Sequence, residues 1–181
     1  MLREFEGIVV VDEAYSDFCR QRPFRLDLHL YPNLIVLNTM SKAWASAAIR
    51  LGMAFASEEI VGLFNKVKYP YNVNMLTCEQ AKRVLAQAGT VARWVGSIIV
   101  ERDRMAPALC ELPFCLKVYP SDANFLLMRV TDADALYHYL VDKGIIVRNR
   151  NRVQLCGNCL RVTVGTSAEN SELLRALRCY K

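Results

Sequence analysis

The sequence predicts an α/β protein in which a mainly parallel sheet is followed by a long bridging helix and then by a small α+β unit. Two continuous apolar runs, residues 7–11 and 33–38, have the β-branched composition of strands that are buried on both faces. From residue 77 to 109, apolar side chains recur every three or four positions, which indicates a helix. After Pro113, short strand patterns alternate with helical ones, as expected of an α+β unit.

Length and composition exclude several classes of protein. The chain has 181 residues, of which 53% are hydrophobic and 23% are charged, and this balance excludes a disordered chain. No apolar run reaches the ~18 residues that a membrane-spanning helix needs, so we expect no membrane association. The opening residues MLREFEG are charged where an export signal would be apolar, and we therefore expect a cytoplasmic location.

The charge distribution argues against nucleic acid as a partner. The formal net charge is +5, but the basic residues are scattered along the chain. Proteins that bind nucleic acid usually concentrate such charge on one face and interleave it with aromatic residues. A solvated basic surface is the simpler interpretation, and a modest basic excess also suits a small anionic substrate.

The seven cysteines are expected to be reduced thiols, because their number is odd and no export signal is present. Cys156 and Cys159 have the C-x-x-C spacing of redox and zinc sites. However, the Gly-Asn pair between them is typical of a turn, and a strand pattern rather than a helix follows. Zinc would also need two further ligands. We therefore expect two cysteines that flank a turn, and no metal site.

The first two strands should run parallel. About twenty residues separate the run that ends at Asp12 from the run that leads into residues 39–42, which is enough for a crossover connection. Because parallel strands present their carboxyl ends at the same edge of a sheet, ligands of such sheets bind there. The residues that follow both strands are therefore the first place to look for a functional site.

The remaining elements follow from periodicity and from cap residues. Ser57 is expected to cap a helix that runs to about Lys66, and residues 77–109 are expected to form one long helix. The C-terminal part is expected to form a small antiparallel sheet with two helices. Its expected strands are residues 116–119, 124–128, 145–147 and 160–164, and its expected helices are residues 132–143 and 168–179.

The carboxyl ends of the two parallel strands gather side chains with a shared chemical use. They are Asp12, Tyr15, Thr39, Ser41, Lys42 and Arg50. A lysine amine can bond covalently to an aldehyde, and an aldehyde cofactor with a pyridine ring needs a carboxylate beside its ring nitrogen. Its phosphate needs an arginine and hydroxyl groups. Each residue alone is more often a surface or cap residue, but the combination predicts a pyridoxal phosphate site.

Several motifs make the sequence resemble the histidinol-phosphate aminotransferase family, whose members are pyridoxal-phosphate enzymes of fold type I in the class II aminotransferase group. The motifs are V-V-D-E-A-Y-x-x-F-C, T-M-S-K-A-x-x-x-A-x-I-R-L-G, P-Y-N-V-N, S-x-A-N-F-L-L, G-I-I-V-R and C-L-R-V-T-V-G-T. The resemblance covers nearly the whole chain but only the C-terminal half of a family member.

This resemblance implies a role for three residues in the chemistry. Lys42 would bind the cofactor aldehyde covalently and, once released by substrate, would move the proton of the substrate α-carbon. Asp12 would pair with the protonated ring nitrogen of the cofactor. Tyr15 would form a hydrogen bond with the oxygen of the ring hydroxyl.

The resemblance also implies how anionic groups are bound. Ser41 and Arg50 would hold the cofactor phosphate, with Thr39 nearby. Arg161 would bind the acidic group of the substrate, and Arg148 would help at its anionic end. Planar guanidinium groups suit both a phosphate and a carboxylate. The family transfers the amino group of L-histidinol phosphate to 2-oxoglutarate, which yields imidazole-acetol phosphate and L-glutamate in histidine biosynthesis, and it works as a homodimer.

The resemblance further implies a division of the chain. Residues 1–105 would be the C-terminal part of a pyridoxal-phosphate-binding large domain with its connecting helix, and residues 106–181 would be the small α+β domain. The family's glycine-containing phosphate loop and the aromatic residue that stacks on the cofactor do not occur here. We therefore expect the chain alone to bind the cofactor weakly and to show little turnover.

Three alternatives remain open from the sequence. The protein could be another class II aminotransferase, an amino-acid phosphate decarboxylase, or a non-catalytic fragment that only self-associates. Substrate choice separates the first two from histidinol-phosphate aminotransferase, because specificity is a ratio of catalytic efficiencies. A dimer that takes up no pyridoxal phosphate would favour the third.

Overall fold

The structure is a computed structural model that describes residues 2–180. It divides the chain into two compact units, of which unit 1 ends at Trp94 and unit 2 begins at Val95. This boundary lies within helix α3 (Ala88–Cys110), the element expected to bridge two substructures. The domain boundary expected after residue 105 lies in the same helix and stays a prediction.

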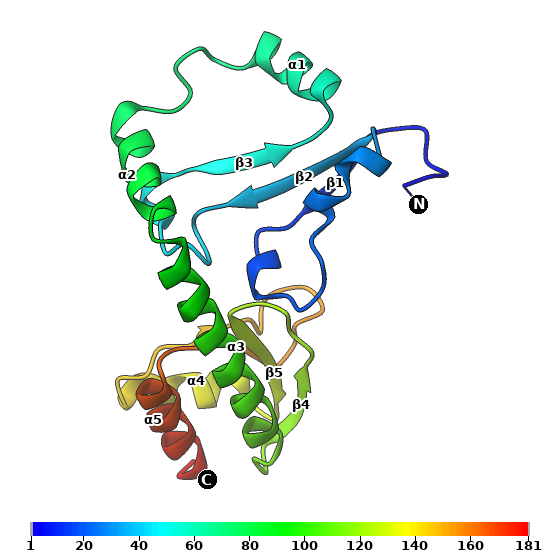
Figure 1. Cartoon of the computed structure of the whole chain (residues 1–181). Coiled ribbons are helices and arrows are strands. Elements are labelled where there is room, and N and C mark those ends of the chain that lie inside the picture. The colour runs from blue at the N-terminus through cyan, green and yellow to red at the C-terminus, as the bar shows by residue number, and fades with distance from the viewer. Residues whose placement is uncertain (1, 181) are drawn as a thin grey trace. The chain divides into compact units, whose positions relative to one another are not determined.

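Unit 1 is built on a three-stranded sheet in the order β1-β2-β3 (Figure 1). Strands β1 (Val9–Asp12) and β2 (Leu34–Thr39) are parallel, with Val9 opposite Leu34, as the crossover argument predicted. Strand β3 (Gly52–Phe55) pairs with β2 in the antiparallel direction. The sequence analysis did not identify β3, because a four-residue run that begins with glycine has little strand signal.

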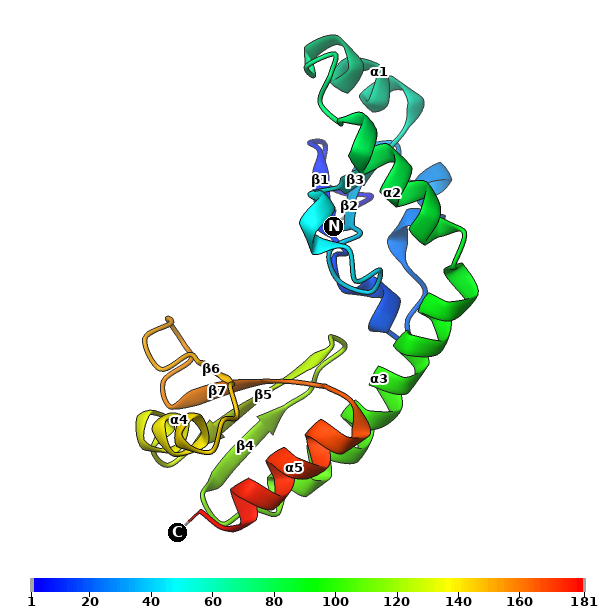
Figure 2. The same cartoon turned by 90° about the vertical axis from the view of Figure 1, so that its left-hand side faces the viewer.

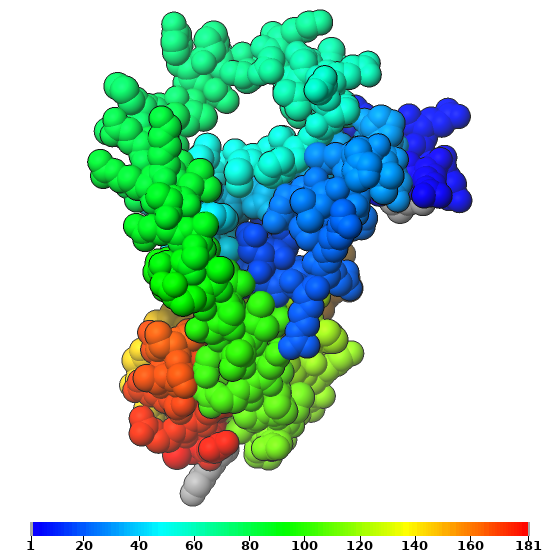
Figure 3. Space-filling model, viewed as in Figure 1, coloured from blue at the N-terminus to red at the C-terminus, as the bar shows by residue number. Residues whose placement is uncertain are grey.

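Short helical turns connect these strands, and two longer helices follow them. Helix α1 (Glu58–Val67) begins after Ser57, as expected, and helix α2 (Met75–Leu85) begins after Asn74. The Asn74 side chain accepts a hydrogen bond from Thr77 N at 2.8 Å, which caps α2. Figure 3 shows open space between β3 and the segment that runs from α1 to α2. The 3-10 turns are Ser16–Phe18, Phe24–Leu26, Leu28–Leu30 and Ala47–Ile49.

The prediction that the first strand is buried on both faces is wrong for this structure. Val9 and Val11 are partly buried, whereas Ile8 and Val10 are both 55% exposed. Residues of a strand alternate between the two faces of its sheet, so one face of β1 is covered and the other is open. The second strand fits the prediction better, because Leu34, Ile35 and Val36 are all buried.

The long helix expected from 77 to 109 is interrupted. Helix α2 ends at Leu85 and α3 begins at Ala88. At the break, Gln87 N donates to Val84 O at 2.9 Å, and Gln87 O accepts from Thr90 N at 2.8 Å. The first helix therefore closes with a tight turn, and Gln87 starts the next. The glycine at position 89, beside the break, lowers the preference for a continuous helix.

Unit 2 contains a four-stranded antiparallel sheet in the order β4-β5-β7-β6, with two further helices (Figure 2). The sheet matches the expected antiparallel α+β arrangement. Its strands are β4 (Cys115–Tyr119), β5 (Phe125–Val130), β6 (Arg148–Asn149) and β7 (Cys159–Thr163), and its helices are α4 (Ala133–Asp142) and α5 (Ser167–Arg178).

The strand expected at 145–147 is displaced. Only Arg148 and Asn149 pair with β7, and residues 145–147 line a cavity of about 400 Å³ beside it. This segment follows Gly144, whose φ of +76° ends helix α4 as the sequence predicted. Two residues of this apolar run are satisfied by packing rather than by strand pairing, because Val147 is buried and Ile145 packs against the core of unit 2, whereas Ile146 is 71% exposed.

The core of unit 2 lies between its sheet and the helices α3, α4 and α5. Helix starts are well capped, since Asp132 accepts from Ala135 N at 2.9 Å and Thr166 forms a capping box with Glu169. The side chains of this core that are at most 1% exposed are Met105, Leu109, Met128, Val130, Ala133, Leu136, Leu140, Leu160, Val162 and Leu177.

Candidate active site

The carboxyl ends of β1 and β2 lie at one edge of the unit 1 sheet. Glu13 N donates to Leu37 O at 2.8 Å, so the parallel pairing continues one residue beyond Asp12. The Asp12 carboxylate accepts a hydrogen bond from Ala14 N at 2.9 Å, which turns the chain sharply after the strand. Asp12 is exposed, so its carboxylate is accessible to a ligand.

Lys42 and Tyr15 meet at this edge. The Lys42 Nζ atom lies 5.2 Å from the centroid of the Tyr15 ring, although the two residues come from the ends of different strands. An ammonium group over an aromatic face at this distance is a cation–π contact. The parallel register therefore brings the predicted lysine and phenol together, as the sequence analysis expected.

The two predicted hydroxyl groups form a pair beside them. The Oγ1 atom of Thr39 and the Oγ atom of Ser41 are 2.9 Å apart, and Ser41 N donates to Thr39 Oγ1 at 3.1 Å. Both residues are half-buried at the end of β2. Adjacent hydroxyl groups of this kind can both donate to the oxygens of a phosphate.

Arg50 comes from the loop that returns to the sheet after Lys42. Met40 N donates to Leu51 O at 3.2 Å, so the two ends of this loop are held together. Arg50 has a φ of 53°, and its Nη1 atom donates to Ala47 O at 3.0 Å. Its guanidinium is exposed and contacts a backbone carbonyl, and within residues 2–180 it makes no hydrogen bond to Ser41.

The sequence analysis missed a buried carboxylate that supports this site. Glu13 is 8% exposed, and its carboxylate accepts from Phe24 N at 2.6 Å and from Arg25 Nη1 at 3.3 Å. Arg25 Nη1 also donates to Ser16 Oγ at 2.8 Å. This network fixes the turn between Asp12 and the segment after it. Glu13 follows Asp12 directly, so strand alternation was the available signal that it points inward.

Asp17 lies beside this network, and burial changes the pKa of its carboxyl. Burial raises the pKa of the Asp17 carboxyl, while the nearby Arg25 lowers it and Glu13 raises it further. Arg25 Nη2 lies 3.5 Å from Asp17 Oδ1, so one guanidinium serves two carboxylates. The turn after β1 therefore depends on Arg25 as a shared positive charge.

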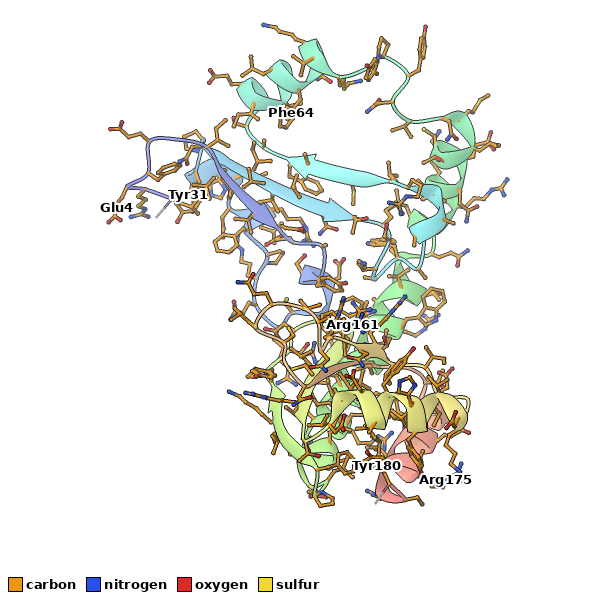
Figure 4. All side chains as sticks on the ribbon, turned by 180° about the vertical axis from the view of Figure 1, so that it is seen from behind. Glu4, Tyr31, Phe64, Arg161, Arg175 and Tyr180 are labelled. Atoms are coloured by element: carbon orange, nitrogen blue, oxygen red, sulfur yellow. The ribbon has the colours of Figure 1, made fainter. Side chains whose placement is uncertain are left out.

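The two arginines expected to bind substrate lie in unit 2. Arg148 and Arg161 are directly opposite each other on strands β6 and β7. The Cζ atom of Arg161 (labelled in Figure 4) lies 5.0 Å from the centroid of the Phe125 ring, and among residues 2–180 no partner accepts a hydrogen bond from its buried Nε atom. Like charges opposite each other on paired strands destabilise a sheet unless an anion lies between them. This pair is therefore a candidate anion site.

Comparisons with known proteins show the family of the chain. The family model for aminotransferase class I and II matches residues 1–177. The chain belongs to this family. The histidinol-phosphate aminotransferase of Bacteroides fragilis strain YCH46 is 57% identical over 181 residues, which is all of this chain and 52% of that protein. The chain thus spans about half the length of the curated relatives it matches.

Solved aminotransferase structures share the fold. The histidinol-phosphate aminotransferase from Clostridium acetobutylicum aligns with a TM-score of 0.85 at 25% identity, over 94% of this chain and 53% of that one. The enzyme of the same name from Sinorhizobium meliloti, solved in complex with pyridoxal-5'-phosphate, aligns with a TM-score of 0.76 at 23% identity, over 94% and 48%. The predicted α/β fold class, that of the C-terminal half of a pyridoxal-phosphate transferase, is confirmed.

The structure brings some of the predicted active-site residues into contact. Lys42 contacts Tyr15, and Thr39 contacts Ser41. Arg148 and Arg161 form a second set in unit 2. The individual roles of these residues, and those of Asp12 and Arg50, stay predictions.

The two cysteines of the C-x-x-C segment flank a turn. Cys159 N donates to Cys156 O at 3.0 Å, which closes the expected turn between the two cysteines, and burial raises the pKa of the Cys159 thiol. Within residues 2–180, no group of three or more potential metal-ligating side chains is close enough to hold an ion. In the same part of the chain, no helix is both long and apolar enough to cross a membrane.

Proposed function

We propose that this protein is a pyridoxal-phosphate-dependent histidinol-phosphate aminotransferase. It would transfer the amino group of L-histidinol phosphate to 2-oxoglutarate, yielding imidazole-acetol phosphate and L-glutamate in histidine biosynthesis. The identity of 57% to a relative of that name supports the choice of substrate. The observation that carries the chemistry is the position of the Lys42 amine over the Tyr15 ring at the shared end of two parallel strands.

The residues of unit 1 fit pyridoxal phosphate. When bound, this cofactor supplies an aldehyde that bonds to amines and a protonated pyridine ring that withdraws electrons from the substrate α-carbon. Lys42 would provide the amine, and its free Nζ would hold and move the proton of the substrate α-carbon. The Asp12 carboxylate would keep the ring nitrogen protonated, because a negative charge nearby favours the charged form. Tyr15 would donate a hydrogen bond to the ring hydroxyl oxygen.

The hydroxyl pair and Arg50 would hold the cofactor phosphate. Thr39 and Ser41 already lie 2.9 Å apart, so their two hydroxyl groups can donate to neighbouring phosphate oxygens. The guanidinium of Arg50 is exposed, and its Nη1 atom donates to the carbonyl oxygen of Ala47. Exchanging this contact for a charge-assisted bond to phosphate is favourable.

Arg161 and Arg148 would bind the anionic groups of the two substrates. The reaction uses a phosphate in one half and a dicarboxylate in the other, and a guanidinium can bind either through two parallel hydrogen bonds. The buried Nε atom of Arg161 that has no acceptor among residues 2–180 supports this role, because a buried donor is costly unless a ligand satisfies it. The opposed position of Arg148 adds a second positive charge.

The partners of the protein follow from this reaction. They are a small amino donor and a 2-oxo acid, and we propose a homodimer in the cytoplasm, since the family that the sequence resembles acts as a dimer. Light scattering tests the assembly. A dimer that takes up no pyridoxal phosphate would favour the non-catalytic alternative instead.

Substrate competition tests the proposed specificity. The full-length protein with pyridoxal phosphate would be assayed with L-histidinol phosphate, L-phenylalanine and L-threonine phosphate as amino donors. We expect kcat/KM for histidinol phosphate to exceed the other values by about 100-fold or more, because a site that pairs with the imidazole and phosphate rejects donors that lack either. Higher efficiency with phenylalanine would indicate another class II aminotransferase. Release of carbon dioxide from threonine phosphate would indicate a decarboxylase.

A further inference from the structure

We propose that Phe125 is a positioning residue, whose ring fixes the direction in which the Arg161 guanidinium meets the carboxylate of a substrate. This inference rests on the proposed function and goes beyond it, because it identifies what holds the binding arginine in place. It follows from the geometry of two neighbouring strands in unit 2.

Strand register places the ring beneath the arginine. Leu127 is directly opposite Arg161, and Phe125 is directly opposite Thr163. Phe125 and Arg161 are thus diagonal neighbours on one face of the sheet, within reach of long and aromatic side chains. The Arg161 Cζ atom lies 5.0 Å from the ring centroid, which is a cation–π distance.

The guanidinium has no other fixed anchor in the part of the chain that the structure describes. No residue accepts a hydrogen bond from its buried Nε atom. On the other neighbouring strand, β6, the residue opposite Arg161 is the like-charged Arg148. Neither the Nε atom nor this neighbour can hold the side chain in one orientation. The attraction between the guanidinium and the face of the ring is the remaining interaction that can do so.

Phe125 is itself held firmly by the segment before it. Its carbonyl oxygen accepts a hydrogen bond from Ser121 Oγ at 2.6 Å, and Ser121 Oγ accepts one from Ala123 N at 3.1 Å. Arg102, which is 4% exposed, donates to Ala123 O at 2.9 Å and so ties this segment to helix α3. These hydrogen bonds fix the backbone that carries the Phe125 ring.

Removing the ring should weaken anion binding without removing the charge that binds the anion. In Phe125→Leu, Arg161 keeps its charge but must be immobilised by the ligand itself. We expect the dissociation constant for a dicarboxylate to rise by about 2- to 30-fold, the range that corresponds to one cation–π contact. Phe125→Tyr keeps an aromatic face and should stay within about 2-fold of the original protein.

The arginine side-chain Nε–H signals in an NMR spectrum of the whole chain give a direct readout. The Arg161 signal, identified by its loss in Arg161→Lys, should be shifted by the ring current of Phe125 and protected from exchange with water. Both properties should disappear in Phe125→Leu and persist in Phe125→Tyr. Loss of the ring-current shift reports only that the ring is close, whereas loss of exchange protection reports that the guanidinium is no longer held, and a merely structural role for the ring would leave this protection unchanged.

Titration with maleate, a dicarboxylate, then measures affinity through the same signal. Phe114→Leu is the matched control, because Phe114 is an aromatic residue of unit 2 that packs against Tyr180 at a ring-centroid distance of 5.1 Å. We expect it to lower stability while leaving maleate affinity unchanged. Equal affinity in Phe125→Leu and the original protein would overturn the inference, and so would equal losses in Phe125→Leu and Phe114→Leu.

The proposed function and the proposed role of Phe125 can be contradicted separately. Covalent labelling of Lys42 by pyridoxal phosphate depends on unit 1 and tests the proposed function alone. If Lys42 is labelled and Arg161→Lys weakens maleate binding, but Phe125→Leu does not, then only the role of Phe125 is wrong. If maleate leaves the Arg161 signal unmoved, the anion site is wrong, and the inference about Phe125 is overturned with it.

Discussion

The two units of the chain bury their apolar residues to very different extents. In unit 2, Met128, Leu136 and Leu160 are completely buried within a continuous core. In unit 1, the sheet leaves Ile8 and Val10 55% exposed, and Leu63 of helix α1 is 53% exposed. Unit 2 has the packing of a self-sufficient domain, whereas unit 1 exposes apolar side chains on both its sheet and its helices.

The two units also carry different parts of the proposed active site. The residues that we propose for the chemistry, such as Lys42 and Asp12, lie on the open unit, at the end of a sheet with one uncovered strand face. The residues that we propose for anion binding, Arg148 and Arg161, lie on strands of the closed unit. The packed core of unit 2 supports the strands that carry these arginines, and the Phe125 ring then orients the Arg161 guanidinium, which favours selective binding.

The largest expected difference between the units comes from deleting a core side chain. Leu136→Ala in helix α4 removes a completely buried side chain, so we expect it to destabilise unit 2 by about 3–5 kcal/mol. Leu63→Ala is the matched change in unit 1, where the side chain is exposed, and should cost less than about 0.5 kcal/mol. Equal costs would contradict the contrast between the units.

Urea unfolding can be followed separately in each unit. Trp44 lies within unit 1, whereas Trp94 is the last residue of that unit and stands in helix α3, which continues into unit 2. The fluorescence of Trp44 in a Trp94→Phe background therefore reports on unit 1. Amide hydrogen exchange of strand β7 reports on unit 2. Leu136→Ala should lower the protection of β7 and leave the fluorescence transition in place.

An intermediate effect is expected from a carboxylate that joins two helices of unit 2. Hydrogen bonds from Arg104 and then from Asn170 lower the pKa of Glu101 from 4.5 to about 2. Because the folded state holds this proton less tightly than the unfolded chain does, the stabilisation is complete above pH 4.5 and is lost as the pH falls toward about 2. Glu101→Gln should therefore destabilise unit 2 by about 1–2 kcal/mol at pH 7, a range reduced for solvent screening at the exposed Arg104.

The pH dependence distinguishes this ion pair from simple packing. The difference between Glu101→Gln and the original protein, measured by urea unfolding from pH 7 down to pH 3, should shrink as the pH falls. The exposed Glu58 of helix α1 is the control, and Glu58→Gln should change stability by less than about 0.5 kcal/mol. A difference at Glu101 that stays constant with pH would mean that the charge of this carboxylate is not what stabilises unit 2.

The smallest effect should come from the uncovered face of β1. Val10→Thr should change the stability of unit 1 by less than about 0.5 kcal/mol, because the side chain is 55% exposed and threonine also suits a strand. Val162→Thr in β7 introduces the same hydroxyl at a side chain that is 1% exposed, and should cost about 1–3 kcal/mol. A comparable loss at Val10 would show that its face of β1 is covered in solution.

The strand ends could be predicted from the sequence because long apolar runs and crossover lengths are local signals. The runs before Asp12 and Thr39 fix two parallel strands, and parallel strands share one edge. The contact between Lys42 and Tyr15 then follows from the register. The sequence did not predict strand β3 or the break between α2 and α3. Both segments are short or contain glycine, so tertiary packing rather than local preference decides their structure.

Other features depend on contacts that no local pattern contains. Phe125 and Arg161 meet diagonally across two strands, so their contact depends on a register that the sequence does not specify. The burial of Glu13 depends on Arg25 and Phe24, which come from a connection without regular periodicity. In the apolar run before Arg148, Ile145 and Val147 pack against the core instead of pairing, while Ile146 is exposed.

Trapping the cofactor chemically tests the central claim most directly. The protein would be mixed with pyridoxal phosphate and reduced with borohydride, digested, and mapped by mass spectrometry, with Lys42→Ala treated in parallel. We predict a single dominant pyridoxyl adduct on the peptide that contains Lys42, and its loss in Lys42→Ala. A label spread over surface lysines such as Lys66 and Lys117, unchanged in Lys42→Ala, would contradict the assignment of Lys42 as the residue that binds the cofactor.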